Sequence, residues 1–124
     1  MVEKLHDHHI VHHRRLHEAN DDNKWIRRRG GLIVPMVLEV HKDLHDNCPG
    51  VPVLDIYMAR RVKGIMMRHD ISEPLVALDT YCMAVETAME TARYEPERLI
   101  GEAAIMAIRM QIPFIKEGMR DGVA

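Results

Sequence analysis

The sequence predicts a mainly α-helical protein with a small ββα element in residues 1–50, followed by a bundle of about three helices in residues 51–124. Beyond residue 51 the apolar residues recur at steps of three and four, which is the spacing of amphipathic helices. Before it, short apolar runs end at glycine or proline, as buried strands do. With 124 residues, the two parts should pack together as one domain with its own core.

The first part of the chain, residues 1–19, is polar and contains six of the nine histidines. Two conformations fit this pattern. A strand would point successive side chains to alternating faces, whereas a helix would place His9, His13 and His17 on one face. Hydrophobic periodicity leaves both conformations open. The following polar residues, 20–24, have the composition of a turn or loop.

A short second strand is predicted where the chain becomes apolar again. The pair Gly30-Gly31 interrupts any regular structure, and the residues that follow, 32–34, are all β-branched or leucine. Pro35 should stop this strand because proline cannot donate a ladder hydrogen bond. We therefore expect a buried strand of about four residues.

The next segment is predicted to be a helix from residue 36 to Asn47, ended by the Pro49-Gly50 pair. Its apolar residues recur at helical spacing, and His41 and His45 lie together on an adjoining stripe. Because side chains four apart project from one side of a helix, these two imidazoles can reach a single ion. Histidine is also the commonest metal ligand.

Three longer helices should complete the domain, over residues 52–69, 72–94 with Ser72 as the N-cap, and 95–113. Pro113 should kink or end the last helix, and residues 118–124 should fray. The apolar side chains predicted to face the core are Leu54, Met58, Val62, Ile65 and Met66 in the first helix, Leu78, Tyr81, Cys82, Val85, Ala88, Met89 and Ala92 in the second, and Leu99, Ala103, Met106 and Met110 in the third, whose face Ile100, Ala104, Ile108 and Ile112 widen.

Composition excludes several classes of protein. A net charge of −2 lacks the overall basic excess of many nucleic-acid-binding proteins, although basic residues cluster between positions 14 and 29. Cys48 and Cys82 are too few and too far apart for a zinc ribbon or a disulfide scaffold, and Cys82 should be a reduced core thiol. No membrane span or secretory signal is recognisable, so we expect a cytoplasmic protein with no membrane partner.

The order of motifs resembles the HNH, or His-Me finger, endonucleases, including the colicin-type nucleases. The pair His8-His9 looks like the first motif of that family, and Leu32–Pro35 looks like its second strand. The segment Glu39–His45 is similar to its closing helix, which carries H-x-x-x-H. Small uncharacterised phage proteins show a similar pattern. The likeness covers roughly the first 50 residues.

This resemblance implies a site for one divalent metal ion (Zn, Ni or Mg) held by His8, His41 and His45, with His9 as the general base. It also implies a DNA substrate, whose phosphates a basic loop could face; its candidate residues are Arg27, Arg28 and Arg29. The family usually has asparagine just before the second strand, where this chain has Gly31. A register that uses His12-His13 as the first motif fits the spacing equally well.

Two functions from different classes follow from these observations. The first is a small metal-dependent DNA endonuclease, phage-encoded and acting in the host cytoplasm. The second is a catalytically inactive HNH-like module that binds a protein partner or self-associates. The retained H-x-x-x-H motif favours the first function. The methionine-rich helices favour the second, because flexible apolar side chains adapt to partner surfaces.

Overall fold

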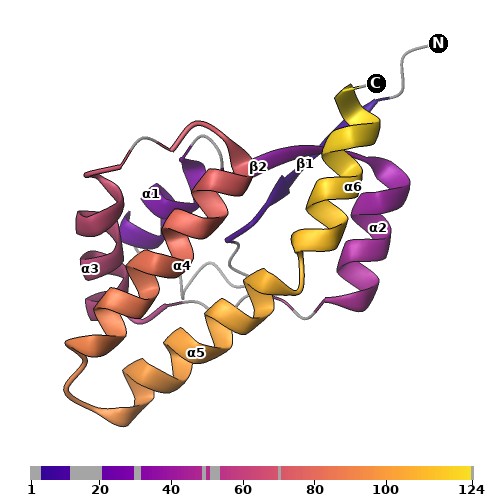
Figure 1. Cartoon of the computed structure of the whole chain (residues 1–124). Helices are drawn as coiled ribbons and strands as arrows, with labels where there is room; N and C mark the ends of the chain where they lie inside the picture. Colours follow the sequence, from indigo (N-terminus) through magenta and orange to yellow (C-terminus); the bar gives the residue numbers. More distant parts are fainter. Residues whose placement is uncertain are drawn as a thin grey trace.

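A computed structural model describes residues 4–11, 21–29, 32–48, 50, 54–69 and 71–123, and only the backbone for 120–123. Two strands and six helices occupy this part of the chain, so the prediction of a mainly α protein with a small N-terminal strand pair is confirmed (Figure 1). In chain order they are β1 (Leu5–His9), α1 (Asp21–Arg28), β2 (Ile33–Val37), α2 (Leu38–Asn47), α3 (Ile56–Met66), α4 (Pro74–Glu90), α5 (Glu95–Arg109) and α6 (Ile112–Val123).

The two strands form an antiparallel pair with one buried and one exposed face. His8 lies opposite Val34, and both side chains are buried, whereas Asp7 and its partner Pro35 are exposed on the other face. The prediction that Pro35 stops the second strand is wrong, because β2 continues through it. Each strand of a two-stranded sheet has a free edge, so a proline without an N–H can lie there.

Helices α2 and α6 lie side by side against the strand pair (Figure 1). A Cβ atom at Gly118 would lie 2.8 Å from Cε of Met36, so α6 approaches β2 too closely for a larger side chain. Helix α6 runs through Val123, so the segment 118–123, which was expected to fray, is helical. Pro113 does not kink or end a long helix; it lies in the first turn of α6, where no helical N–H is needed.

The core of the helical part joins α3, α4 and α5. The core face predicted for the first of these helices is confirmed: four of its five residues are buried, including Leu54 just before α3, and Ile65 is half-buried. The core face predicted for the second is also confirmed: all its residues are buried, including Ala92 just after α4, except Met89, which is half-buried. The first stripe predicted for α5 is wrong, because Leu99 is 55% exposed and Met106 67%. Small residues face α4 instead: a Cβ at Gly101 would lie 2.6 Å from the Met89 side chain.

The predicted loop at residues 20–24 is wrong from residue 21 onward, because α1 begins there. Asp21 and Asp22 occupy its first turn and Arg27 and Arg28 its last, so both ends complement the helix dipole. Ile26 is fully buried and anchors the helix. A helix this short gains most of its stability from such tertiary contacts, which composition does not indicate.

The helix boundaries also differ from the predicted ones. Asp55 is the N-cap of α3, where its carboxylate accepts a hydrogen bond from the Met58 amide at 2.8 Å. The predicted N-cap Ser72 is not used, since α4 begins after Glu73, whose side chain makes no capping bond. Helix α4 also stops at Glu90, before the predicted end at Tyr94.

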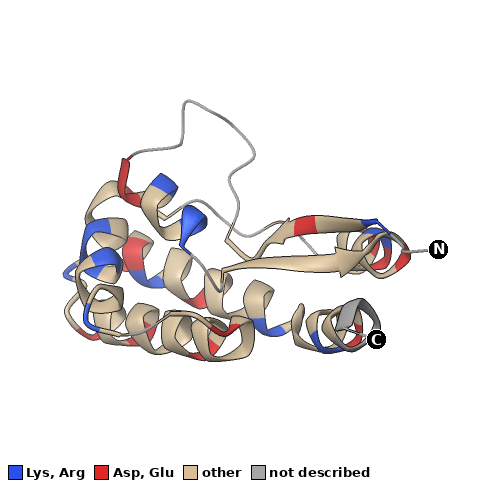
Figure 2. Cartoon of the chain, turned by 90° about the horizontal axis from the view of Figure 1, so that it is seen from above, with Lys and Arg blue, Asp and Glu red and all other residues tan. Residues whose placement is uncertain are grey.

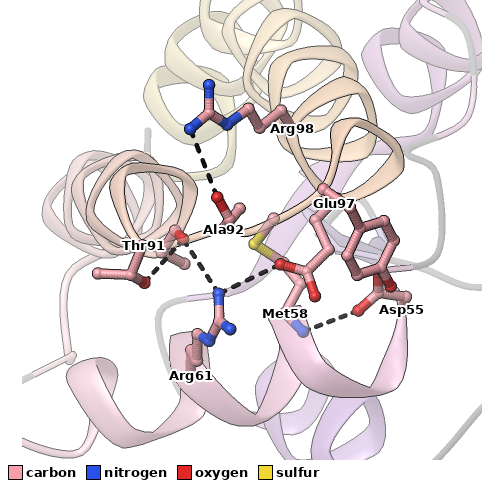
Figure 3. A network of polar contacts seen from close by, with 9 residues as sticks. Asp55, Met58, Arg61, Thr91, Ala92, Glu97 and Arg98 are labelled. Atoms are coloured by element: carbon pink, nitrogen blue, oxygen red, sulfur yellow. Dashed lines mark hydrogen bonds and ion pairs between the residues drawn. The ribbon is translucent and has the colours of Figure 1, made fainter.

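A polar network joins α3 to the end of α4 and the start of α5 (Figure 3). The guanidinium of Arg61 lies 3.2 Å from the carboxylate of Glu97, which is almost fully buried. The same guanidinium donates to the carbonyl oxygen of Ala88 at 3.4 Å. One arginine thus neutralises a buried charge and bonds a carbonyl near the C-terminal end of α4.

Cys48 and Cys82 are both free and buried, which confirms the reduced core thiol predicted for Cys82. Burial raises the pKa of each thiol above its ordinary value. None of the helices in the described part of the chain combines the length and the apolar character that crossing a bilayer requires.

Candidate metal centre

Helix α2 presents His41 and His45 together. Their Nε2 atoms are 3.0 Å apart, and their ring centroids are 4.6 Å apart. This closeness follows from the spacing of four residues, which places both side chains on one side of the helix. His41 is half-buried and His45 is exposed, so the pair lies at the edge of the core.

His8 approaches this pair from β1. Its buried ring lies 5.2 Å from that of His41 and 5.5 Å from that of His45, measured between centroids. One nitrogen from each of the three residues lies within 4.8 Å of the other two. The fold therefore brings together the three residues that the sequence suggested as metal ligands, across 33 positions from His8 to His41.

The geometry of this His8–His41–His45 cluster fits a divalent metal ion. Metal–nitrogen bonds of 2.0–2.1 Å around a tetrahedral ion separate the nitrogens by about 3.4 Å. The 3.0 Å between the Nε2 atoms of His41 and His45 is close to that value. The ligand nitrogens of all three residues lie within 4.8 Å of one another, so small rotations of the rings would bring them to metal-binding distance. Three imidazoles could hold a metal ion and leave a coordination position open.

The surroundings of His41 lower its pKa and so favour the neutral imidazole. Burial lowers its pKa most, and the charges of His45, His6 and His9 lower it further. Only a neutral imidazole has a lone pair available for a metal ion, so these effects favour the form that binds metals. His6 takes part in this cluster of rings, with its centroid 6.2 Å from that of His41.

Gln111 is a residue of the centre that the sequence analysis missed. Its side-chain oxygen lies 2.7 Å from Nε2 of His8, and its amide nitrogen lies 3.5 Å from the carbonyl oxygen of Ile10. With the amide in this orientation, Nε2–H of His8 donates to Gln111, which places the lone pair of the neutral ring on Nδ1. The bond thus fixes the tautomer and plane of His8, as partners of metal-binding histidines commonly do.

Replacing Gln111 with leucine is expected to weaken metal binding by about 10–100-fold, because His8 loses the acceptor that orients it. A competition titration with a chromophoric chelator measures the affinity. The Gln111→Glu variant keeps an acceptor at the same place and should bind metal at least as tightly as the native chain. Equal affinities in the native protein and the leucine variant would show that Gln111 does not orient a ligand.

His9, the expected general base, lies beside this cluster and is not part of it. Strand alternation directs its side chain to the opposite face from His8, and it is half-buried. The protonated form of His9 would lower the pKa of His41. Burial lowers the pKa of His9 most and the Arg27 cation lowers it further, while Asp7 acts in the opposite direction. The lowered pKa favours the neutral imidazole of His9.

The three expected phosphate-binding arginines do not act as one group. Arg27 is half-buried and influences His9, whereas Arg28 and Arg29 are exposed around Trp25. Figure 2 shows the basic residues of α1 near those of α3, at the opposite end of the molecule from α2. Trp25 belongs to α1 and packs on the core.

Other residues of the predicted site lie outside the part of the chain that the structure describes. These include His12 and His13, which form the alternative first motif. Gly31, at the position where the HNH family has asparagine, is also outside it. Within the described residues, only His8, His41 and His45 form a group that could hold a metal ion.

Comparison of the chain with protein-family models, with curated proteins and with solved structures gives no match. The chemistry of the His8–His41–His45 cluster and its neighbours is therefore the basis on which a function can be assigned.

Proposed function

We propose that this chain is a metal-dependent phosphodiesterase that cleaves nucleic acid, in the manner of the HNH endonucleases it resembles. The observation that supports this proposal most is the convergence of His8 on β1 with His41 and His45 on α2, the helix that follows the second strand β2. Those three residues are the ones the resemblance implies, although α1 is inserted between the two strands. Zn²⁺ and Ni²⁺ suit three imidazoles better than Mg²⁺, which prefers oxygen ligands.

Each residue has a distinct role in this proposal. His8, His41 and His45 hold the ion, and Gln111 keeps His8 in the required tautomer. The ion, when bound, supplies positive charge that stabilises a phosphoryl oxygen during displacement. His9 accepts a proton from the attacking water, for which a neutral imidazole is the competent form.

A plasmid-nicking assay with added Zn²⁺, Ni²⁺ or Mg²⁺ tests the catalytic step. We expect cleavage by the native chain, and a loss of about 10²–10⁴-fold in rate for His9→Ala, the usual contribution of a general base. His69→Ala is the matched control, because His69 is an exposed histidine at the end of α3 and should leave the rate unchanged.

Two results would contradict this proposal. Cleavage that persists in purified His9→Ala protein would exclude His9 as the base. Metal binding without any cleavage of plasmid or single-stranded DNA would exclude catalysis and favour the inactive, partner-binding module instead.

A further inference from the structure

A hollow of about 370 Å³ lies beside α1, away from the metal centre. Trp25 forms part of its wall, and three cations and one carboxylate complete the lining: Lys24, Arg28, Arg29 and Asp21. Asp21, Lys24, Trp25 and Arg28 share one face of α1, because positions 21, 24, 25 and 28 follow the helical repeat, and Arg29 follows directly after the helix. The volume is within the range of small-ligand sites.

The ring of Trp25 is held within reach of two cations. The guanidinium carbon of Arg29 lies 4.9 Å from the ring centroid and Nζ of Lys63 lies 5.6 Å from it. Both distances are those of cation–π contacts. The indole is half-buried and packs on the core, so it is a fixed aromatic surface at the wall of the hollow.

The hollow carries a surplus of positive charge. The nearby acidic residue Asp22 is neutralised by α3, with Nζ of Lys63 at 3.2 Å and Nε of Arg60 at 3.7 Å. Among the charged groups of the described residues that line the hollow, Asp21 alone opposes the three cations. An aromatic surface surrounded by cations matches the chemistry of a nucleotide, which combines a flat base with an anionic phosphate.

We propose that this hollow binds an unpaired nucleotide of a single-stranded nucleic acid, with the base against Trp25 and the adjoining phosphates on Lys24, Arg28 and Arg29. The position of the hollow beside α1 favours a nucleic-acid strand over a free nucleotide as its ligand. Arg27, the neighbour of Arg28 in α1, lowers the pKa of His9 by its charge, so the helix that lines the hollow also influences the proposed catalytic residue. The assignment of this strand as the substrate rests on the proposed function, whereas its binding does not require the metal.

Trp25 is the only tryptophan in the chain, so its fluorescence reports on the hollow directly. The full-length protein is titrated with a short oligothymidylate in EDTA at low salt, where no cleavage can occur. We expect quenching of the emission, and less quenching by a duplex of the same length, because paired bases are not available to stack. A thymidine monophosphate should bind at least 10-fold more weakly, since it has a single phosphate.

The Arg28→Ala/Arg29→Ala variant tests the cations. Two fewer phosphate contacts should make the plot of log affinity against log salt shallower by about 1.4, at about 0.7 per contact. The Arg93→Ala/Lys116→Ala variant removes the same charge from exposed positions outside the hollow and should bind as the native chain does.

Three outcomes would overturn this inference. They are no quenching by the oligonucleotide, equal affinity for the monophosphate and the oligonucleotide, and an unchanged salt dependence in the Arg28→Ala/Arg29→Ala variant. Failure of the proposed catalysis has a different signature, because the oligonucleotide would still bind in EDTA while the metal-loaded protein left it intact.

Discussion

Zn²⁺ or Ni²⁺ at about 100 times its dissociation constant is expected to raise the melting temperature of this protein by roughly 10 °C. Binding to the folded state alone contributes about 2.7 kcal/mol at that concentration. In a domain of this size, 1 kcal/mol shifts the melting temperature by roughly 4 °C. Differential scanning calorimetry with and without the ion measures the shift, and excess EDTA should reverse it.

The variant His41→Ala/His45→Ala should lose this shift completely, because only His8 of the cluster remains. His69→Ala is again the control, since it removes an exposed histidine at a distance and should keep the full shift. A native protein whose melting temperature does not respond to any of these ions would refute the metal centre, and with it the proposed phosphodiesterase.

Replacing Arg61 with alanine is expected to destabilise the fold by about 2 kcal/mol, less than for a fully buried ion pair because 34% of the Arg61 side chain is exposed. The carboxylate of Glu97 would remain buried, with 2% of its side chain exposed, and lose its cation at 3.2 Å. The carbonyl oxygen of Ala88 would lose a donor as well. Urea unfolding followed by circular dichroism gives the change in free energy.

The pair Arg109–Glu86 is a matched control for this prediction. Its atoms are 3.1 Å apart, but its side chains are 60% and 50% exposed. Exposed pairs of this kind contribute under about 1 kcal/mol, so Arg109→Ala should have a small effect. Adding Glu97→Gln to Arg61→Ala should recover part of the stability, because it removes the stranded charge. Similar losses for Arg61→Ala and Arg109→Ala would contradict the importance of burial.

Hydrophobic spacing predicted the helical part where one apolar stripe dominates, as in α3 and α4. It was only half right in α5, where both faces carry apolar residues: the stripe of Ile100, Ala104, Ile108 and Ile112 contacts the core, whereas the other predicted stripe is exposed. Gly101 lets α5 approach Met89 closely, while the larger Leu99 and Met106 face outward. Spacing along one segment cannot show which of two apolar faces has a partner.

The predictions for two prolines and for one charged segment were wrong for a different reason. Pro35 lies inside β2 and Pro113 in the first turn of α6, two positions where a missing N–H costs little. The charged run that begins at Asp21 forms a helix because Ile26 finds a buried place in the core. In each case contacts with distant parts of the chain determine the local conformation, and local composition does not contain that information.

The candidate centre was partly predictable. His41 and His45 follow from helical spacing, and His8 joined them through the family resemblance, since spacing alone could not relate residues 33 positions apart. Gln111 gave only a faint signal, as a polar residue in an apolar stretch beside a proline. Its role depends on a contact 103 positions away, which no local pattern contains.

That long-range contact has a consequence for how the protein is made. During synthesis the ribosome releases His8 and the histidines of α2 well before Gln111, yet His8 reaches its oriented state only when Gln111 is in place. The nascent chain therefore cannot complete the oriented His8–His41–His45 cluster early. Under the proposed function, uptake of the ion should follow the emergence of the C-terminal helices, so that an incomplete polypeptide does not bind it.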